Sequence, residues 1–195
     1  MNSLTIAAAS VATESGLPSA RLGPRFGRLD LQSQLALLAV SELKVDFTAF
    51  PPDRIGICLA TSAGSLATDF NFWKGRHNPG GPSPTLFAYT LPSAAAGEIA
   101  IHFRLTGPNL CFVGDDRVPL PEGVAMIRRG EADGCVCVFC EVATADCAPV
   151  IPGPPVATAC AIFLKRGGNG LRELREIDRD MKPLCTLISQ INSAG

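Results

Sequence analysis

Three cysteines in the segment "GCVCVFCEV", residues 134–142, are close enough in sequence to suggest a metal site. Cys135, Cys137 and Cys140 fall within six residues, and thiolates are the ligands that zinc and iron–sulfur clusters take. In an extended strand, however, Cys135 and Cys137 lie on one face and Cys140 on the other. No further Cys-x-x-Cys pair lies elsewhere in the chain. We therefore expect structural cysteines, no metal and no other cofactor.

The other cysteines also favour a reduced protein. Most of the eight lie in apolar runs such as "IGICLA" and "ATACAIFL", where a free cysteine behaves as a small buried hydrophobe. Together with an N-terminus that lacks the positive region of a signal peptide, and with no run near the roughly 18 apolar residues of a membrane span, this predicts a cytoplasmic protein.

Size and charge limit the classes of function. The chain has 195 residues, 47% of them hydrophobic, which is enough for one sizeable core but small for two domains. Its formal net charge is −1 and only 6% of its residues are aromatic. A protein with no excess of basic residues and few aromatic side chains is a poor candidate for nucleic acid binding.

The elements that would position these residues alternate along the chain. Apolar runs and helical spacings predict strands at 4–12, 54–62, 109–114, 134–142 and 157–165, and helices at 30–43, 63–75, 93–107 and 121–130. Such alternation favours an α/β domain with a mainly parallel sheet. We expect this domain to cover residues 1–177 and a peripheral C-terminal segment to cover residues 178–195.

Several segments in this order resemble a known family. The pieces "DLQSQLALLAVSEL", "RIGICLATSAGSLATDFNFW", "SAAAGEIAIHFRLTGPN" and "IRRGEADGCVCVFCEV" are similar to the N-terminal half of a β-ketoacyl-acyl-carrier-protein synthase, of the thiolase-like superfamily. The resemblance runs from about residue 3 to about residue 177. It implies a single thiolase-like half fold, a mainly parallel sheet with helices packed on it.

The chain departs from this family at the catalytic elbow. The resemblance implies a nucleophilic cysteine after "GPNLCFVG", at a helix N-terminus that lowers its pKa. Here the sequence is "VGDDRVPLPEG", so Asp115 or Asp116 falls at the nucleophile position, and a carboxylate cannot carry an acyl chain as a thioester. Pro119 and Pro121 disfavour helical backbone at the residues before them, which predicts an elbow opened into an extended connection.

No other residue in the sequence replaces the missing chemistry. The family has a C-terminal repeat with two catalytic histidines and an oxyanion-hole amide, whereas this chain has only His77 and His102, neither in such a motif. Cys111 is the nearest thiol to the altered elbow, and as a strand cysteine we expect it to be inert rather than a displaced nucleophile. We predict no catalytic residue.

The resemblance suggests a partner subunit as the function. We expect a catalytically inactive ketosynthase-like protein that pairs with an active ketosynthase in fatty-acid or polyketide-type synthesis, as chain-length factors do in type II polyketide and aryl-polyene systems. The pair would be a heterodimer, with self-association as the alternative. Asp115 and Asp116 would then form either a solvated acidic turn or capping and ion-pair contacts at an interface.

Two other functions stay open at this point. The chain could be a freestanding module that binds acyl chains or acyl carrier protein. Its docking residues for that acidic partner would be Arg128 and Arg129, together with the scattered Arg21, Arg25 and Arg28. It could also be an acyltransferase or hydrolase that uses Cys111 or the aspartate pair.

Overall fold

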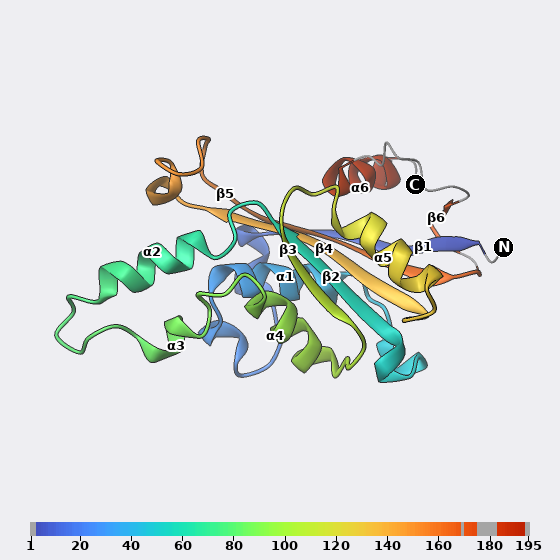
Figure 1. The fold of residues 1–195 in the computed structure, drawn as a ribbon, viewed down its shortest axis with the longest axis horizontal. Helices are drawn as coiled ribbons and strands as arrows, with labels where there is room; N and C mark the ends of the chain where they lie inside the picture. Colours follow the sequence, from blue (N-terminus) through green and yellow to red (C-terminus); the bar gives the residue numbers. More distant parts are fainter. Residues whose placement is uncertain (1–2, 169, 175–182, 194–195) are drawn as a thin grey trace.

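The computed structural model describes residues 3–168, 170–174 and 183–193, and its centre is one six-stranded sheet. The strand order is β3-β2-β4-β5-β1-β6. The strands are β1 (Leu4–Thr13), β2 (Ile55–Thr61), β3 (Asn109–Val113), β4 (Gly134–Ala143), β5 (Val156–Arg166) and β6 (Arg172–Leu174). Figure 1 shows β2 and β4 crossing the middle of the molecule.

The strand directions confirm the predicted half fold. β2 runs parallel to β3 and β4, whereas β5 runs antiparallel to both β4 and β1, and β6 is antiparallel to β1. β1, β2, β3 and β4 therefore share one direction. β2 and β4 are buried along their whole lengths, as expected for central strands covered on both faces.

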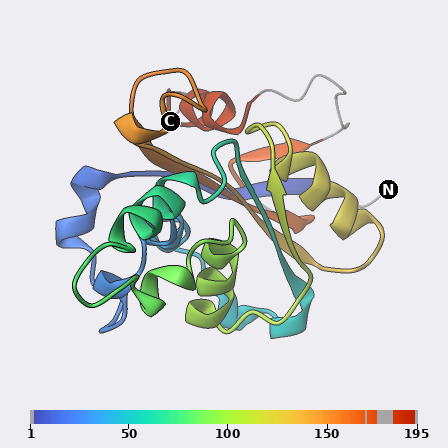
Figure 2. The ribbon, with the colours of Figure 1, turned by 60° about the vertical axis from the view of Figure 1, so that its left-hand side comes forward.

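Helices cover both faces of the sheet. The helices are α1 (Leu31–Glu42), α2 (Leu66–Gly75), α3 (Pro84–Phe87), α4 (Ala94–Phe103), α5 (Pro119–Arg128) and α6 (Leu184–Ser193). Short 3₁₀ helices lie at Glu14–Ser19, Phe26–Arg28, Phe47–Ala49, Pro52–Arg54 and Ala145–Cys147. α1 and α4 belong to one hydrophobic core, and α5 and α6 to the other. α2 and α3 extend beyond the end of the sheet (Figure 1), and Figure 2 shows the sheet between the group α1–α4 and the pair α5 and α6.

Helix α1 begins where the sequence predicts. The Asp30 side chain caps it by accepting a hydrogen bond from the Ser33 amide at 3.0 Å, and its other oxygen accepts the Thr68 hydroxyl at 2.8 Å. Of the nine consecutive α1 positions 32–40, all but Gln34 are buried, so the helix is enclosed on most sides. A helix that is apolar nearly all round is typical of such a position.

The cysteines of β4 lie as the strand periodicity predicts. Cys135 and Cys137 face the core beneath α5, whereas Cys140 faces α1 and donates to the Gln32 carbonyl at 3.4 Å. Helix α5 approaches closely at Gly123, where a Cβ would lie 2.5 Å from the Cys137 sulfur. Among the described residues, no group of three or more potential ligands is placed to hold a metal ion.

The expectation of an extended elbow was wrong. Helix α5 starts at Pro119 and includes Leu120 and Pro121, and Val118 already has helical backbone angles of φ −71° and ψ −46°. Both prolines lie in the first helical turn, where a backbone N–H has no intrahelical acceptor, so the absence of this group is tolerated. The connection from β3 to α5 is therefore a compact turn.

The C-terminal helix packs against the sheet. The boundary predicted at residue 177 lies outside the described residues, but α6 begins at Leu184 and contacts β1 and β5. Leu184 and Ile188 are fully buried in the same core as α5. Within the described part of the chain, no helix is long and apolar enough to cross a membrane.

Candidate functional site

The loop at residues 114–118 joins β3 to α5 and contains the predicted nucleophile position. The Gly114 amide donates to the Thr61 carbonyl at 3.0 Å, which continues the β2–β3 ladder into the loop. α5 follows at once and packs against β2 and β4. The loop therefore has a defined position above the ends of two parallel strands.

Asp115 and Asp116 point to different partners. The Asp115 carboxylate is exposed and accepts the Arg117 amide at 2.9 Å, while its carbonyl accepts the Val118 amide at 3.3 Å. Side chains of this kind stabilise their own turns. Asp115 thus closes the loop locally.

Asp116 connects the loop to the C-terminal helix. Its carbonyl accepts the Leu184 amide at 3.1 Å, and its carboxylate accepts the Cys185 amide at 3.5 Å. These are N–H groups of the first turn of α6, which have no intrahelical acceptor and which an anionic group satisfies well. Asp116 therefore acts as a cap supplied from outside the helix, about 70 residues away in sequence.

Cys111 is partly buried in the middle of β3. Burial raises the pKa of its thiol, which reduces the thiolate fraction at neutral pH. His102 is exposed and its ring lies 4.7 Å from that of Phe103. The structure therefore does not bring His102 or Cys111 together with the aspartates as a catalytic group, and their roles stay predictions.

Arg128 and Arg129 lie at the opposite end of α5 from the loop. Both are exposed. The Arg129 guanidinium forms two hydrogen bonds with the Glu131 carboxylate, at 2.6 and 2.9 Å. Arg128 and Arg129 are thus separated from the loop by a helix of ten residues, which spans roughly 15 Å.

Sequence reasoning missed the role of Glu141. This residue lies at the end of β4, is only 8% exposed, and accepts the amides of Ser62 and Ala63 at 2.7 and 2.9 Å. Both oxygens of the carboxylate are thus used to fix the turn after β2. A single acid in the apolar run "CVCVFCEV" was the available signal, because a buried charge requires partners.

The turn that Glu141 fixes lies against the end of β3. Gly64 in this turn has a φ of +60°, which favours glycine. A Cβ at Gly64 would lie 3.4 Å from Pro92 and 3.9 Å from Val113. The turn after β2 therefore contacts the ends of both β3 and β4.

The outer edge of β3 is apolar and open. Its sequence is "NLCFV", and β3 is the terminal strand of the sheet in the described residues, paired only with β2. Its last residue, Val113, is 68% exposed, and Leu91 and Ile101 on the preceding segment and α4 are exposed by 62% and 61%. An exposed apolar edge strand is a template for pairing with another chain.

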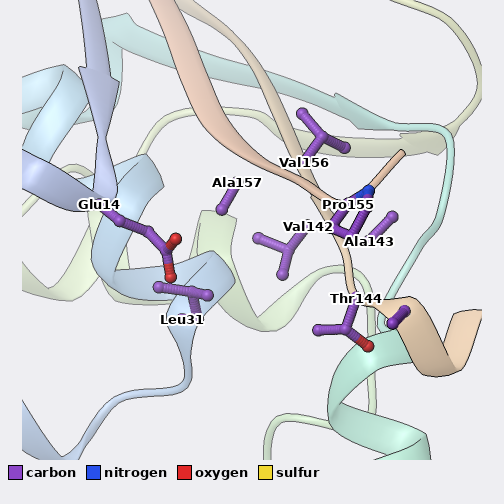
Figure 3. Close-up of a pocket in the computed structure, with 9 residues that line it drawn as sticks. Glu14, Leu31, Val142, Ala143, Thr144, Pro155, Val156 and Ala157 are labelled. Carbon is purple, nitrogen blue, oxygen red and sulfur yellow. The ribbon is translucent and has the colours of Figure 1, made fainter. Parts of the chain in front are cut away.

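A pocket of about 200 Å³ lies at the ends of β4 and β5. Figure 3 shows Val142, Ala157 and Leu31 around it, with the Glu14 carboxylate beside Leu31. Pockets for drug-sized ligands usually have about 300–1,000 Å³. This pocket is therefore small for an acyl chain.

Known structures share the fold of this chain. Similar chains occur in the ishigamide ketosynthase/chain length factor (TM-score 0.66, 18% identity, 84% of this chain and 62% of that one) and in the ketosynthase ApeO in complex with its chain length factor ApeC from Xenorhabdus doucetiae (0.64, 19%, 86% and 80%). A third occurs in AntDE:AntF, a type II PKS acyl-carrier protein in complex with its ketosynthase bound to the hexaketide (0.70, 15%, 90% and 68%).

The sequence comparisons add no further relative, since no family model and no curated protein matches the chain. The chain spans 62% of the matched ishigamide chain. In contrast, the aligned shares of 86% and 80% mean that this chain and the matched chain of the ApeO–ApeC complex have similar lengths. The chain has the thiolase-like half fold of ketosynthases and chain length factors.

Proposed function

We propose that this chain is a non-catalytic, chain-length-factor-like subunit that pairs with an active ketosynthase in cytoplasmic polyketide or fatty-acid type synthesis, including aryl polyenes. The observation that carries the proposal is the open apolar edge of β3 in a ketosynthase-like half fold. The partner would pair along this edge. The pair would be a heterodimer.

The elbow supports a non-catalytic role. Asp116, one of the two residues predicted at the nucleophile position, uses both its carbonyl and its carboxylate to cap α6. Cys111, the strand thiol that precedes the elbow in sequence, has a raised pKa because of burial. A residue engaged in capping and a thiol that stays protonated are both poor nucleophiles.

The edge of β3 supports a partner subunit. Leu110, Cys111 and Phe112 are partly exposed, and Val113 is mostly exposed. The neighbouring strand β2, in contrast, is buried throughout. Such apolar surface is stabilised when a partner covers it.

The comparison with the ApeO–ApeC complex supports the proposal that a chain as short as this one can pair with a ketosynthase. A chain of similar length to this one belongs to an assembly of a ketosynthase with its chain length factor. Arg128 and Arg129 remain our predicted contacts for the acidic acyl carrier protein, because both side chains are exposed at the end of α5.

A reconstitution experiment tests the catalytic part of this proposal. The purified chain is mixed with malonyl- and acyl-loaded carrier proteins, alone and together with a ketosynthase from the same organism. We expect no consumption by the chain alone, and a changed distribution of product lengths when the chain joins the ketosynthase. The Cys111→Ser variant should still change the product lengths, because serine keeps the size of the side chain at this strand position and no chemical step uses the thiol.

Two results would contradict the proposal. Consumption of malonyl-loaded carrier protein by the chain alone, with loss of that activity in Cys111→Ser, would indicate an enzyme with a relocated nucleophile. A product distribution that does not respond to the chain would remove the chain-length role.

A further inference from the structure

Cys160 and Cys185 meet where α6 packs on the sheet. Cys160 lies on β5, and Cys185 lies in the first turn of α6. Cys185 packs against the hydrophobic core that contains Cys160, and the two thiols are close enough to perturb each other's pKa. The two residues are 25 positions apart in sequence, so the contact depends on the packing of α6.

The surroundings of the pair fix this geometry. Leu184 and Ile188 of α6 are fully buried in the core that also contains Cys160. The Cys185 amide donates to the Asp116 carboxylate, which orients the first turn of the helix. Contacts on both sides of Cys185 thus hold its sulfur next to that of Cys160.

The two thiols differ in accessibility. Cys160 is only 2% exposed, whereas Cys185 is partly exposed. A small oxidant in solution can therefore reach Cys185 first. This is the usual arrangement of a reactive cysteine beside a resolving cysteine.

The pKa shifts of the two thiols also favour Cys185 as the first to react with an oxidant. The interaction between the two thiols lowers the pKa of Cys185, although burial and the nearby Asp116 carboxylate oppose this effect. The same interaction and burial raise the pKa of Cys160. Cys185 therefore carries the larger thiolate fraction.

A second thiol cluster provides an internal comparison. The sulfurs of Cys135 and Cys137 lie 4.0 Å apart, and Cys58 contacts Cys135. All three residues are 0% exposed beneath α5. Neighbouring thiols therefore occur twice in the described residues, but only the pair of Cys160 and Cys185 includes a thiol that solvent can reach.

We propose that Cys160 and Cys185 form an oxidisable pair that closes to a disulfide in the presence of a peroxide and fixes α6 to β5. The disulfide would also stabilise the capped loop at Asp116, because this loop holds the N-terminus of α6. This inference is independent of the proposed pairing with a ketosynthase.

The reaction balances with hydrogen peroxide as the oxidant. The Cys185 thiolate attacks one peroxide oxygen, the O–O bond breaks, hydroxide leaves and the sulfur becomes a sulfenic acid. The Cys160 thiol then attacks this sulfur, the S–S bond forms, the S–O bond breaks and water leaves with the thiol proton. The peroxide is reduced by two electrons, and the two cysteines are oxidised.

The test is mass spectrometry of the purified full chain after hydrogen peroxide treatment. We expect the intact mass to fall by two hydrogens, and six instead of eight cysteines to react with iodoacetamide after denaturation. A tryptic digest without reductant should link peptide 130–165 to peptide 180–195. Because peptide 130–165 contains five cysteines, variants must identify the partner.

Cys160→Ala and Cys185→Ser should each abolish the link. Cys111→Ser, which alters another partly buried thiol, should retain it. Oxidation should also raise the melting temperature by roughly 5–10 °C in the unmodified chain but not in Cys185→Ser, since the disulfide closes a 25-residue loop. The melting curve of reduced Cys160→Ala shows whether that variant still folds.

Three outcomes would overturn the inference. They are a link that survives in Cys185→Ser, a disulfide among Cys58, Cys135 and Cys137, and oxidation of Cys185 to a sulfinic acid with no link to peptide 130–165.

Discussion

Replacement of Glu141 with alanine should lower the free energy of unfolding by about 3 kcal/mol, because hydrogen bonds to a buried charged group contribute roughly 1.5–3 kcal/mol each. The Glu141 carboxylate accepts the amides of Ser62 and Ala63 at 2.7 and 2.9 Å. Alanine removes both acceptors and leaves the Ala63 amide buried without a partner. For a chain of 195 residues, this loss corresponds to a fall in melting temperature of roughly 6–12 °C.

Thermal and urea unfolding followed by circular dichroism would measure this loss. Glu141→Gln should have a smaller effect, since its amide oxygen can still accept one of the two N–H groups while its NH₂ group faces the other. Glu42→Ala removes an exposed glutamate at the end of α1 and should change stability by less than about 0.5 kcal/mol. Equal stability of Glu141→Ala and Glu42→Ala would show that the carboxylate does not support the turn.

Replacement of Val113 with lysine should weaken pairing with a ketosynthase by at least about 30-fold, because a charge at an apolar centre of an interface costs 2 kcal/mol or more. Val113 ends the open edge strand and is 68% exposed. The folded chain alone tolerates a lysine at such a position, since the side chain reaches water. The loss should therefore appear in binding and not in the melting temperature.

Val150→Lys is a matched control. Val150 is also exposed, by 62%, and lies in the segment between β4 and β5, two strands that β2 separates from β3 in the sheet. Titration of the labelled ketosynthase with each variant should give an affinity within about twofold of the unmodified chain for Val150→Lys. Equal affinities for the two variants would place the contact away from the β3 edge.

The fold could be predicted from the sequence because its signals are local. The apolar run of β2 indicated a central strand, and the period of two in "CVCVFC" placed Cys135 and Cys137 on one face and Cys140 on the other. Asp30 likewise marked the start of α1. Each of these features depends on residues that are close together in the chain.

The features that were missed depend on contacts between distant segments. The capping of α6 by Asp116 joins residues about 70 positions apart, and Glu141 accepts amides that lie 78 and 79 positions before it. Leu120 is helical although it precedes Pro121, because the first turn of a helix tolerates a residue without an N–H group. Tertiary packing of α5 against β2 and β4 favours helix there.

The central claim is best tested by co-expression of the chain with each full-length ketosynthase of the same organism, followed by size-exclusion chromatography with light scattering. The account predicts a stable one-to-one complex with one of them, which the Val113→Lys variant fails to form. A monomer or homodimer that elutes apart from every ketosynthase would contradict the account.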